Sequence, residues 1–145
     1  IEDHINLFPE HPLRGKNYDE LGTRFPDMSE AYDKKLRLMA MEIAKEKNIK
    51  LQHGVYVGVQ GPTFETPAEY HFFRTIGGDA VGMSTVPEVI CARHAGMRVC
   101  GFSYISNKAA GLFEEKLSHE DVVAAFSMTS DKFYSLLDAL LERIN

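Results

Sequence analysis

Three short segments of the chain place polar side chains beside aromatic or apolar ones. They are Thr63-Phe64-Glu65, Met83-Ser84-Thr85 and Ser106-Asn107-Lys108. A carboxylate next to an aromatic ring, as at Glu65, suits a flat heterocycle that carries N–H donors. Asn107 can donate and accept hydrogen bonds at once, which suits the amide-like edge of a purine or pyrimidine. The alternative reading is structural, with Glu65 serving a helix dipole and Asn107 serving a turn.

The segment around Ser84 points to anion binding. It lies just before a predicted helix, whose first backbone N–H groups have no partner within the helix and can bind an anion. The Ser84 hydroxyl could add a further donor, and Met83 could pack on an apolar face of a ligand. In the alternative reading, Thr85 only caps the helix and Met83 only fills the core.

Strands and helices are predicted to alternate around these segments. We expect a loop over 8–30, a helix from Ser29, and then the order βαβαβα, with strands over 55–59, 80–83 and 98–105. Two of the helices begin with capping-box patterns, Thr66-Pro67-Ala68-Glu69 and Thr85-Val86-Pro87-Glu88, and the last begins at Ser118. This alternation predicts an α/β sheet with helices on both faces. Ligands of such sheets bind at the carboxyl ends of the strands, where all three polar segments fall.

Composition narrows the function classes. The chain has 145 residues, a length that suits a single domain over 1–145, and its 44% hydrophobic content and formal net charge of −5 argue against intrinsic disorder. We expect no nucleic-acid binding, since no basic stripe is present, and no membrane span or secretory signal.

Cys91 and Cys100 match no zinc spacing and are expected to be buried, reduced thiols of a cytoplasmic protein. No metal site is expected, and His4, His11, His53, His71 and His94 are interpreted as structural or solvated. Phosphate-loop, dinucleotide and nucleophilic-hydrolase motifs are absent from the sequence.

Five segments occur together and in order in a known family. They are Asp3-His4-Ile5-Asn6-Leu7, Gly54-Val55-Tyr56, the run over 61–69 from Gly61-Pro62 to Ala68-Glu69, the run over 79–89 from Asp79-Ala80 to Glu88-Val89, and Ser106-Asn107-Lys108. On these residues the chain closely resembles the trimeric, low-molecular-mass purine nucleoside phosphorylases, and its Ser106–Gly111 run resembles bacterial members. The resemblance implies a three-layer α/β/α fold with a central mixed sheet. It covers only the C-terminal half of such enzymes, whose main phosphate loops lie in the other half. The chain by itself is therefore expected to be inactive.

The resemblance also implies a role for each matching residue. Glu65 would accept a hydrogen bond from the purine N1–H, and Asn107 would bond O6 and N7 as the catalytic group. Ser84 would contact phosphate. The other implied nucleoside contacts are Phe64, Val81, Met83, Tyr56 and His119, with Phe25 closing the pocket of a neighbouring subunit in a homotrimer. The implied reaction is reversible phosphorolysis of 6-oxopurine nucleosides such as inosine and guanosine, with inorganic phosphate as co-substrate and no metal or organic cofactor.

Other readings stay open at this point. A methylthioadenosine phosphorylase of the same fold resembles the chain overall, but has an acidic residue where Asn107 stands and lacks the purine-binding Glu. A non-catalytic, purine-binding piece of a phosphorylase is a second alternative. An unrelated α/β domain with coincidental motifs is a third, and it would need three independent matches at strand ends.

Overall fold

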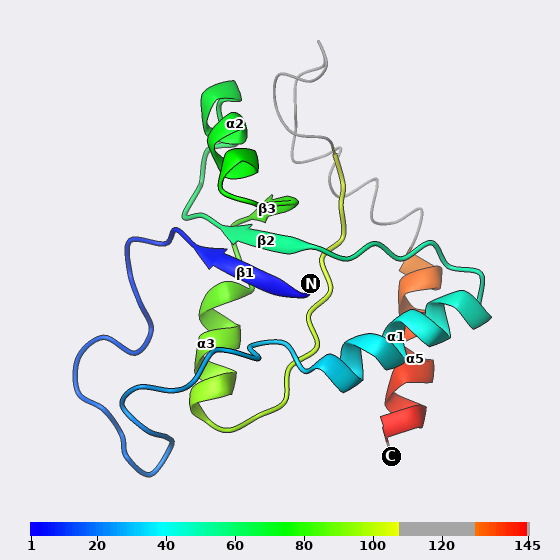
Figure 1. Cartoon of the computed structure of the whole chain (residues 1–145), viewed down its shortest axis with the longest axis horizontal. Helices are drawn as coiled ribbons and strands as arrows, with labels where there is room; N and C mark the ends of the chain where they lie inside the picture. The colour runs from blue at the N-terminus through cyan, green and yellow to red at the C-terminus, as the bar shows by residue number, and fades with distance from the viewer. Residues whose placement is uncertain (108–129, 145) are drawn as a thin grey trace.

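The computed structural model describes residues 1–107 and 130–144. In chain order the elements are β1 (Asp3–Asn6), α1 (Lys34–Glu46), β2 (Val55–Gly58), α2 (Pro67–Thr75), β3 (Ala80–Gly82), α3 (Val86–His94) and α5 (Ser130–Ile144). The residues between β1 and α1 contain no helix or strand, which confirms the predicted long loop. Most of this loop lies to one side of the sheet (Figure 1).

The three described strands form one parallel sheet in the order β1-β2-β3. Its last residues are in register, with Asn6 opposite Gly58 and Gly58 opposite Gly82. All three strands therefore end at the same edge of the sheet. The α/β class is confirmed. The mixed sheet is not seen in this part of the chain, because each described strand is joined to the next through a helix, as parallel strands require.

Helices α2 and α3 lie on opposite sides of the sheet (Figure 1). Tyr56 of β2 packs with Val86 and Ile90 of α3 in one buried cluster, while the next residue, Val57, is fully buried. Successive side chains of a strand point to opposite faces, so burial of both means that both faces of β2 are covered. A second cluster joins α1 to α5 through Ala40, Ile43, Ala44, Leu136 and Leu140.

The first helix begins later than predicted. Ser29 does not start it, because its backbone N–H and hydroxyl bond to Asp27 Oδ1 at 3.0 and 2.6 Å and close a local turn. The cap is Asp33, whose carboxylate accepts from the Leu36 N–H at 2.9 Å, and α1 starts at Lys34. The predicted start at Ser118 lies outside the described residues.

Two strand predictions were wrong. Residues 98–105 form no strand, because this stretch bonds to isolated partners instead of a ladder: Val99 O accepts from the Asp33 N–H at 2.8 Å, and Gly101 O accepts from the Ile1 ammonium group at 2.8 Å. Conversely, β1 was not predicted as a strand. Four residues with Ile5 as the one large apolar side chain give no alternating signal.

The cysteines are also less buried than expected. Cys91 on α3 is exposed and Cys100 is half-buried, and neither forms a disulfide. Burial raises the pKa of the Cys100 thiol. Among the described residues, none of the helices combines the length and apolar character needed to cross a membrane.

Candidate functional site

A cavity of about 300 Å³ opens where β1 and β2 end. Its walls come from three places: Leu7 after β1, the connection between β2 and α2, and the first turns of α2. The lining residues are Leu7, Val59, Gln60, Gly61, Thr63, Phe64, Glu65, Glu69 and Phe73. The cavity thus lies at the edge of the sheet where the sequence placed a ligand site, and two of the predicted site residues, Phe64 and Glu65, line it together.

Two carboxylates line this cavity, and they are not equivalent. Glu69 accepts from the Thr66 backbone N–H at 2.7 Å and from the Thr66 hydroxyl at 2.9 Å. Thr66 in turn accepts from the Glu69 N–H, which completes the predicted capping box. The Thr66 N–H, followed by its hydroxyl, lowers the pKa of Glu69 below its usual value. Glu65 has no hydrogen bond or ion pair with any residue in 1–107 or 130–144, so its carboxylate is the one available to a ligand.

Phe64 and Met83 place apolar surface at this site. Phe64 is 41% exposed beside Glu65, and Met83 is 38% exposed after β3. Gly61 has a φ of +64°, and a side chain on it would collide with the Met83 sulfur. Met83 therefore packs directly against the cavity wall at Gly61, where the positive φ favours glycine. This arrangement brings the end of β3 beside the cavity built by β2 and α2.

The segment after β3 does not form the predicted capping box. Thr85 has a φ of +73° and ψ of −54°, and its side chain caps no N–H of α3. Its hydroxyl lies 3.2 Å from the Ser84 hydroxyl instead. The prediction failed because the chain leaves Gly82 and enters α3 at Val86 through residues 83–85 alone. That connection turns too sharply for Thr85 to take the extended backbone of a capping residue.

Tyr56 and Val81 are placed in the sheet. Tyr56 is 3% exposed, and a side chain on Gly82 would collide with its hydroxyl. It is therefore part of the core between the sheet and α3 and does not line the Glu65 cavity. Val81 pairs with Val57 and is half-buried. Both residues support the end of β3, where Met83 and Ser84 follow.

Asn107 lies at the end of the first described range. Its Oδ1 accepts from the Ser106 hydroxyl at 2.5 Å, and the residue is half-buried. It is not among the residues that line the Glu65 cavity. His119 lies outside the described residues. The predicted roles of both residues stay predictions.

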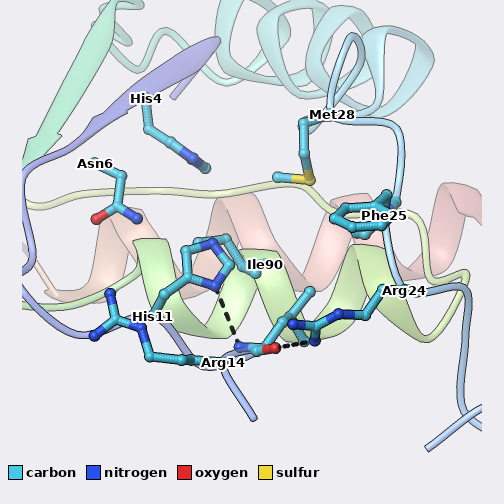
Figure 2. A pocket seen from close by; sticks show the side chains of 10 residues that line it. His4, Asn6, His11, Arg14, Arg24, Phe25, Met28 and Ile90 are labelled. Atoms are coloured by element: carbon cyan, nitrogen blue, oxygen red, sulfur yellow. Dashed lines mark hydrogen bonds between the residues drawn. The ribbon is translucent and has the colours of Figure 1, made fainter. Parts of the chain in front are cut away.

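Phe25 belongs to a second cavity, of about 590 Å³, between β1, α3 and the loop over 8–30. Figure 2 shows His4 and Asn6 of β1 and Ile90 of α3 on its walls, with His11, Arg14, Arg24, Phe25 and Met28 from the loop. Arg24 donates to Leu13 O at 2.6 Å, and its guanidinium lies 5.8 Å from the centre of the Phe25 ring. Phe25 is 86% exposed and apart from the Glu65 cavity.

His4, on the wall of this second cavity, is held in place by a buried tyrosine. Its Nδ1 lies 3.0 Å from the hydroxyl of Tyr32, which is 1% exposed. Burial lowers the pKa of His4 and raises the pKa of Tyr32, so both groups favour their neutral forms. The expected structural role of His4 fits this pairing.

Sequence reasoning missed several wall residues of the Glu65 cavity, namely Leu7, Gln60 and Phe73, whereas Thr63 lies in a segment that it singled out. Leu7 was missed because β1, the strand that it follows, was not predicted. The Gly61-Pro62 pair, which follows the predicted strand over 55–59, was a turn signal for the segment that carries Gln60 to the cavity. No group of three or more His, Cys, Asp or Glu side chains within 1–107 and 130–144 could hold a metal ion.

Comparison with known proteins places the chain in a family. A family model described as the phosphorylase superfamily matches residues 1–142. The chain belongs to this superfamily. It is 55% identical over 141 residues to purine nucleoside phosphorylase 1 of Bacillus subtilis, a match that covers 97% of this chain and 52% of that protein. The resemblance read from the sequence segments is thereby confirmed.

Solved structures of the family agree with the fold. A Schistosoma mansoni purine nucleoside phosphorylase in complex with inosine matches with a TM-score of 0.89 and 38% identity, over 97% of this chain and 52% of that one. A Schistosoma mansoni purine nucleoside phosphorylase in complex with adenosine matches with a TM-score of 0.92 and 37% identity, over 99% of this chain and 54% of that one. The chain spans about half the length of the relatives it matches.

Proposed function

We propose that the full-length protein carrying this sequence is a purine nucleoside phosphorylase. The observation that carries the proposal is the pair of carboxylates in the cavity at the sheet edge. Glu69 is held by the helix cap, whereas Glu65 is left to a ligand beside the exposed ring of Phe64. A carboxylate next to an aromatic ring suits a purine whose N1 carries a proton. The identity to named purine nucleoside phosphorylases supports the same reading.

In the proposed reaction a phosphate oxygen attacks C1′ of the nucleoside and the bond between C1′ and the purine N9 breaks. The bonding electrons go to the purine, which gains a proton in exchange for the one that hydrogen phosphate loses, and the sugar leaves as (deoxy)ribose 1-phosphate. Asn107 would stabilise the charge that develops at O6 and N7, so it acts on the transition state more than on the substrate. Ser84 would contact phosphate, Met83 and His119 would contact the sugar, and Val81 and Tyr56 would line or support the base site. No metal or organic cofactor enters this scheme.

The proposal includes the assembly. Phe25 would close the nucleoside site of a neighbouring subunit in a homotrimer, a role that its 86% exposure and its place outside the Glu65 cavity allow. We propose that the protein acts in the cytoplasm, in purine salvage.

The test is release of hypoxanthine from inosine by the full-length protein, with and without phosphate, and with adenosine and methylthioadenosine as parallel substrates. We expect release from inosine only when phosphate is present, and turnover of adenosine lower by about 10⁴-fold because it lacks N1–H and carries an amino group at position 6. Turnover is the decisive readout, since a related enzyme has been crystallised with adenosine bound. Preference for methylthioadenosine would favour the rival phosphorylase, and purine binding without turnover would favour the non-catalytic reading.

A further inference from the structure

Thr85 has a backbone conformation that its residue type disfavours. Its φ of +73° and ψ of −54° are those of a γ-turn with positive φ, and the Val86 N–H donates to Ser84 O across it at 2.8 Å. This turn is rare and strained, and the β-branched side chain of threonine adds to the strain. Glycine would adopt the same backbone without strain. A function of the threonine side chain would explain why this position is not a glycine.

The turn is fixed at both ends. Before it, Gly82 packs against the Tyr56 hydroxyl at the end of β3. After it, Val86 is fully buried with Tyr56 and Ile90. Because both ends pack on the same tyrosine, residues 83–85 cannot relax without disrupting the core. Strain that is enforced by its surroundings in this way is typical of functional sites.

The turn frees the Thr85 hydroxyl from helix capping. At the start of α2, the equivalent hydroxyl of Thr66 is engaged in the capping box. At α3 no such bond forms, and the Thr85 Oγ1 lies 3.2 Å from Ser84 Oγ, a long hydrogen bond in which either hydroxyl can be the donor. Ser84 itself is exposed at the strand edge that carries the candidate site. One hydroxyl thus orients the other at the point where anion binding was predicted.

We propose that Thr85 is a positioning residue for phosphate, whose hydroxyl is diverted from helix capping by the γ-turn and holds the Ser84 hydroxyl in place. The inference rests on the proposed function, because it assigns Ser84 to phosphate. It adds a residue that acts through Ser84 and does not itself need to touch the reacting atoms. It also explains why a threonine occupies a position whose backbone conformation glycine would adopt with less strain.

The experiment compares three variants of the full-length protein: Thr85→Val, which keeps the branched shape without the hydroxyl, Thr85→Ser, which keeps the hydroxyl, and Thr85→Gly, which removes both the hydroxyl and the strain. Steady-state kinetics would vary phosphate and inosine separately. We expect the KM for phosphate to rise about tenfold in Thr85→Val and Thr85→Gly, to stay within about threefold in Thr85→Ser, and the KM for inosine to change by less than about threefold in all three.

Stability separates positioning from a structural role. Thr85→Gly should have a Tm equal to or above that of the wild type while its KM for phosphate rises. An unchanged phosphate KM in a folded Thr85→Val and Thr85→Gly would overturn the inference and leave the proposed function standing. Equal defects in Thr85→Ser and Thr85→Val would also overturn it, because the hydroxyl would then not matter. A wild-type protein that releases no hypoxanthine from inosine with phosphate would overturn the proposed function and this inference together.

Discussion

The starts of α2 and α3 carry the same sequence signature and have different structures. Each follows a parallel strand and reads Thr-x-x-Glu with a proline at the first or second helical position. At α2, Thr66 has an extended backbone, with φ of −75° and ψ of 160°, and forms the full capping box with Glu69. At α3, Thr85 has a φ of +73° and caps nothing. The signature alone therefore does not decide the structure.

The length of the connection accounts for the difference. The chain has residues 59–66 in which to pass from β2 to α2, and only residues 83–85 in which to pass from β3 to α3. The longer path lets Thr66 adopt the backbone that capping needs, and its wall residues form the Glu65 cavity. The shorter path forces a γ-turn and leaves its hydroxyls at the sheet edge. One helix start is thus built for stability, and the other places strain at the candidate phosphate site.

The largest expected effect separates the two carboxylates at the α2 start. Glu65→Ala should lower kcat/KM for inosine about 10- to 100-fold, since a hydrogen bond to a charged group contributes about 1.5–3 kcal/mol, and should leave the Tm nearly unchanged. Glu69→Ala is the matched control, because it removes a carboxylate from the same cavity that is already bound to Thr66. Steady-state kinetics and thermal unfolding of both variants test this division. A loss of activity in Glu69→Ala as large as in Glu65→Ala would show that the two groups are not divided in this way.

The next effect tests the caps themselves. Thr66→Ala should lower the free energy of unfolding by about 1 kcal/mol and the Tm by a few degrees, because it removes the acceptor for the Glu69 N–H. Thr85→Ala should lower neither by a comparable amount, since its hydroxyl caps no N–H of α3. Differential scanning calorimetry of the pair gives the answer. Equal losses in the two variants would contradict the assignment of capping to α2 alone.

These two helix starts also show which features of the structure could be predicted from the sequence. The strand–helix alternation from Val55 to His94, the capping box of α2 and the position of the candidate site at the strand ends could all be predicted, because each depends on local residue types. The conformation of Thr85 could not, since it depends on the length of a connection between two packed elements. The same holds for residues 98–105, whose apolar pattern suited a strand but whose hydrogen-bond partners include Asp33, the residue that caps α1, and Ile1. The wall residues Leu7 and Gln60 could not be predicted without β1 and the turn at Gly61.

Substitution by glycine, with an effect of at most about 1 kcal/mol, should change stability in opposite directions at the two helix starts. Thr85→Gly should raise the free energy of unfolding by about 1 kcal/mol, because relief of a strain of about 1–3 kcal/mol exceeds the cost of about 0.5–1 kcal/mol for the more flexible unfolded chain. Thr66→Gly should lower it by a few tenths of a kcal/mol, since glycine is a tolerable cap in an extended backbone. Urea unfolding with a shared m-value would measure both. Destabilisation by Thr85→Gly would mean that the left-handed backbone stores no strain.

The smallest effect is the pH dependence of the α2 cap. The Thr66 N–H and hydroxyl lower the pKa of Glu69 below its usual value of 4.5, so folding favours the carboxylate. Its contribution is fully present above pH 4.5 and is lost as the pH falls through the lower pKa of the folded state. The Tm difference between the wild type and Glu69→Gln should therefore be constant from about pH 8 to pH 5.5 and shrink as the pH falls below 4.5.

Glu88→Gln removes the same charge at the matching position of α3, where no capping box exists, and is the control for the change in net charge. If both variants lost their Tm difference over the same pH range, the effect would come from the helix dipole or from overall charge, and the capping box of α2 would have no pH dependence of its own.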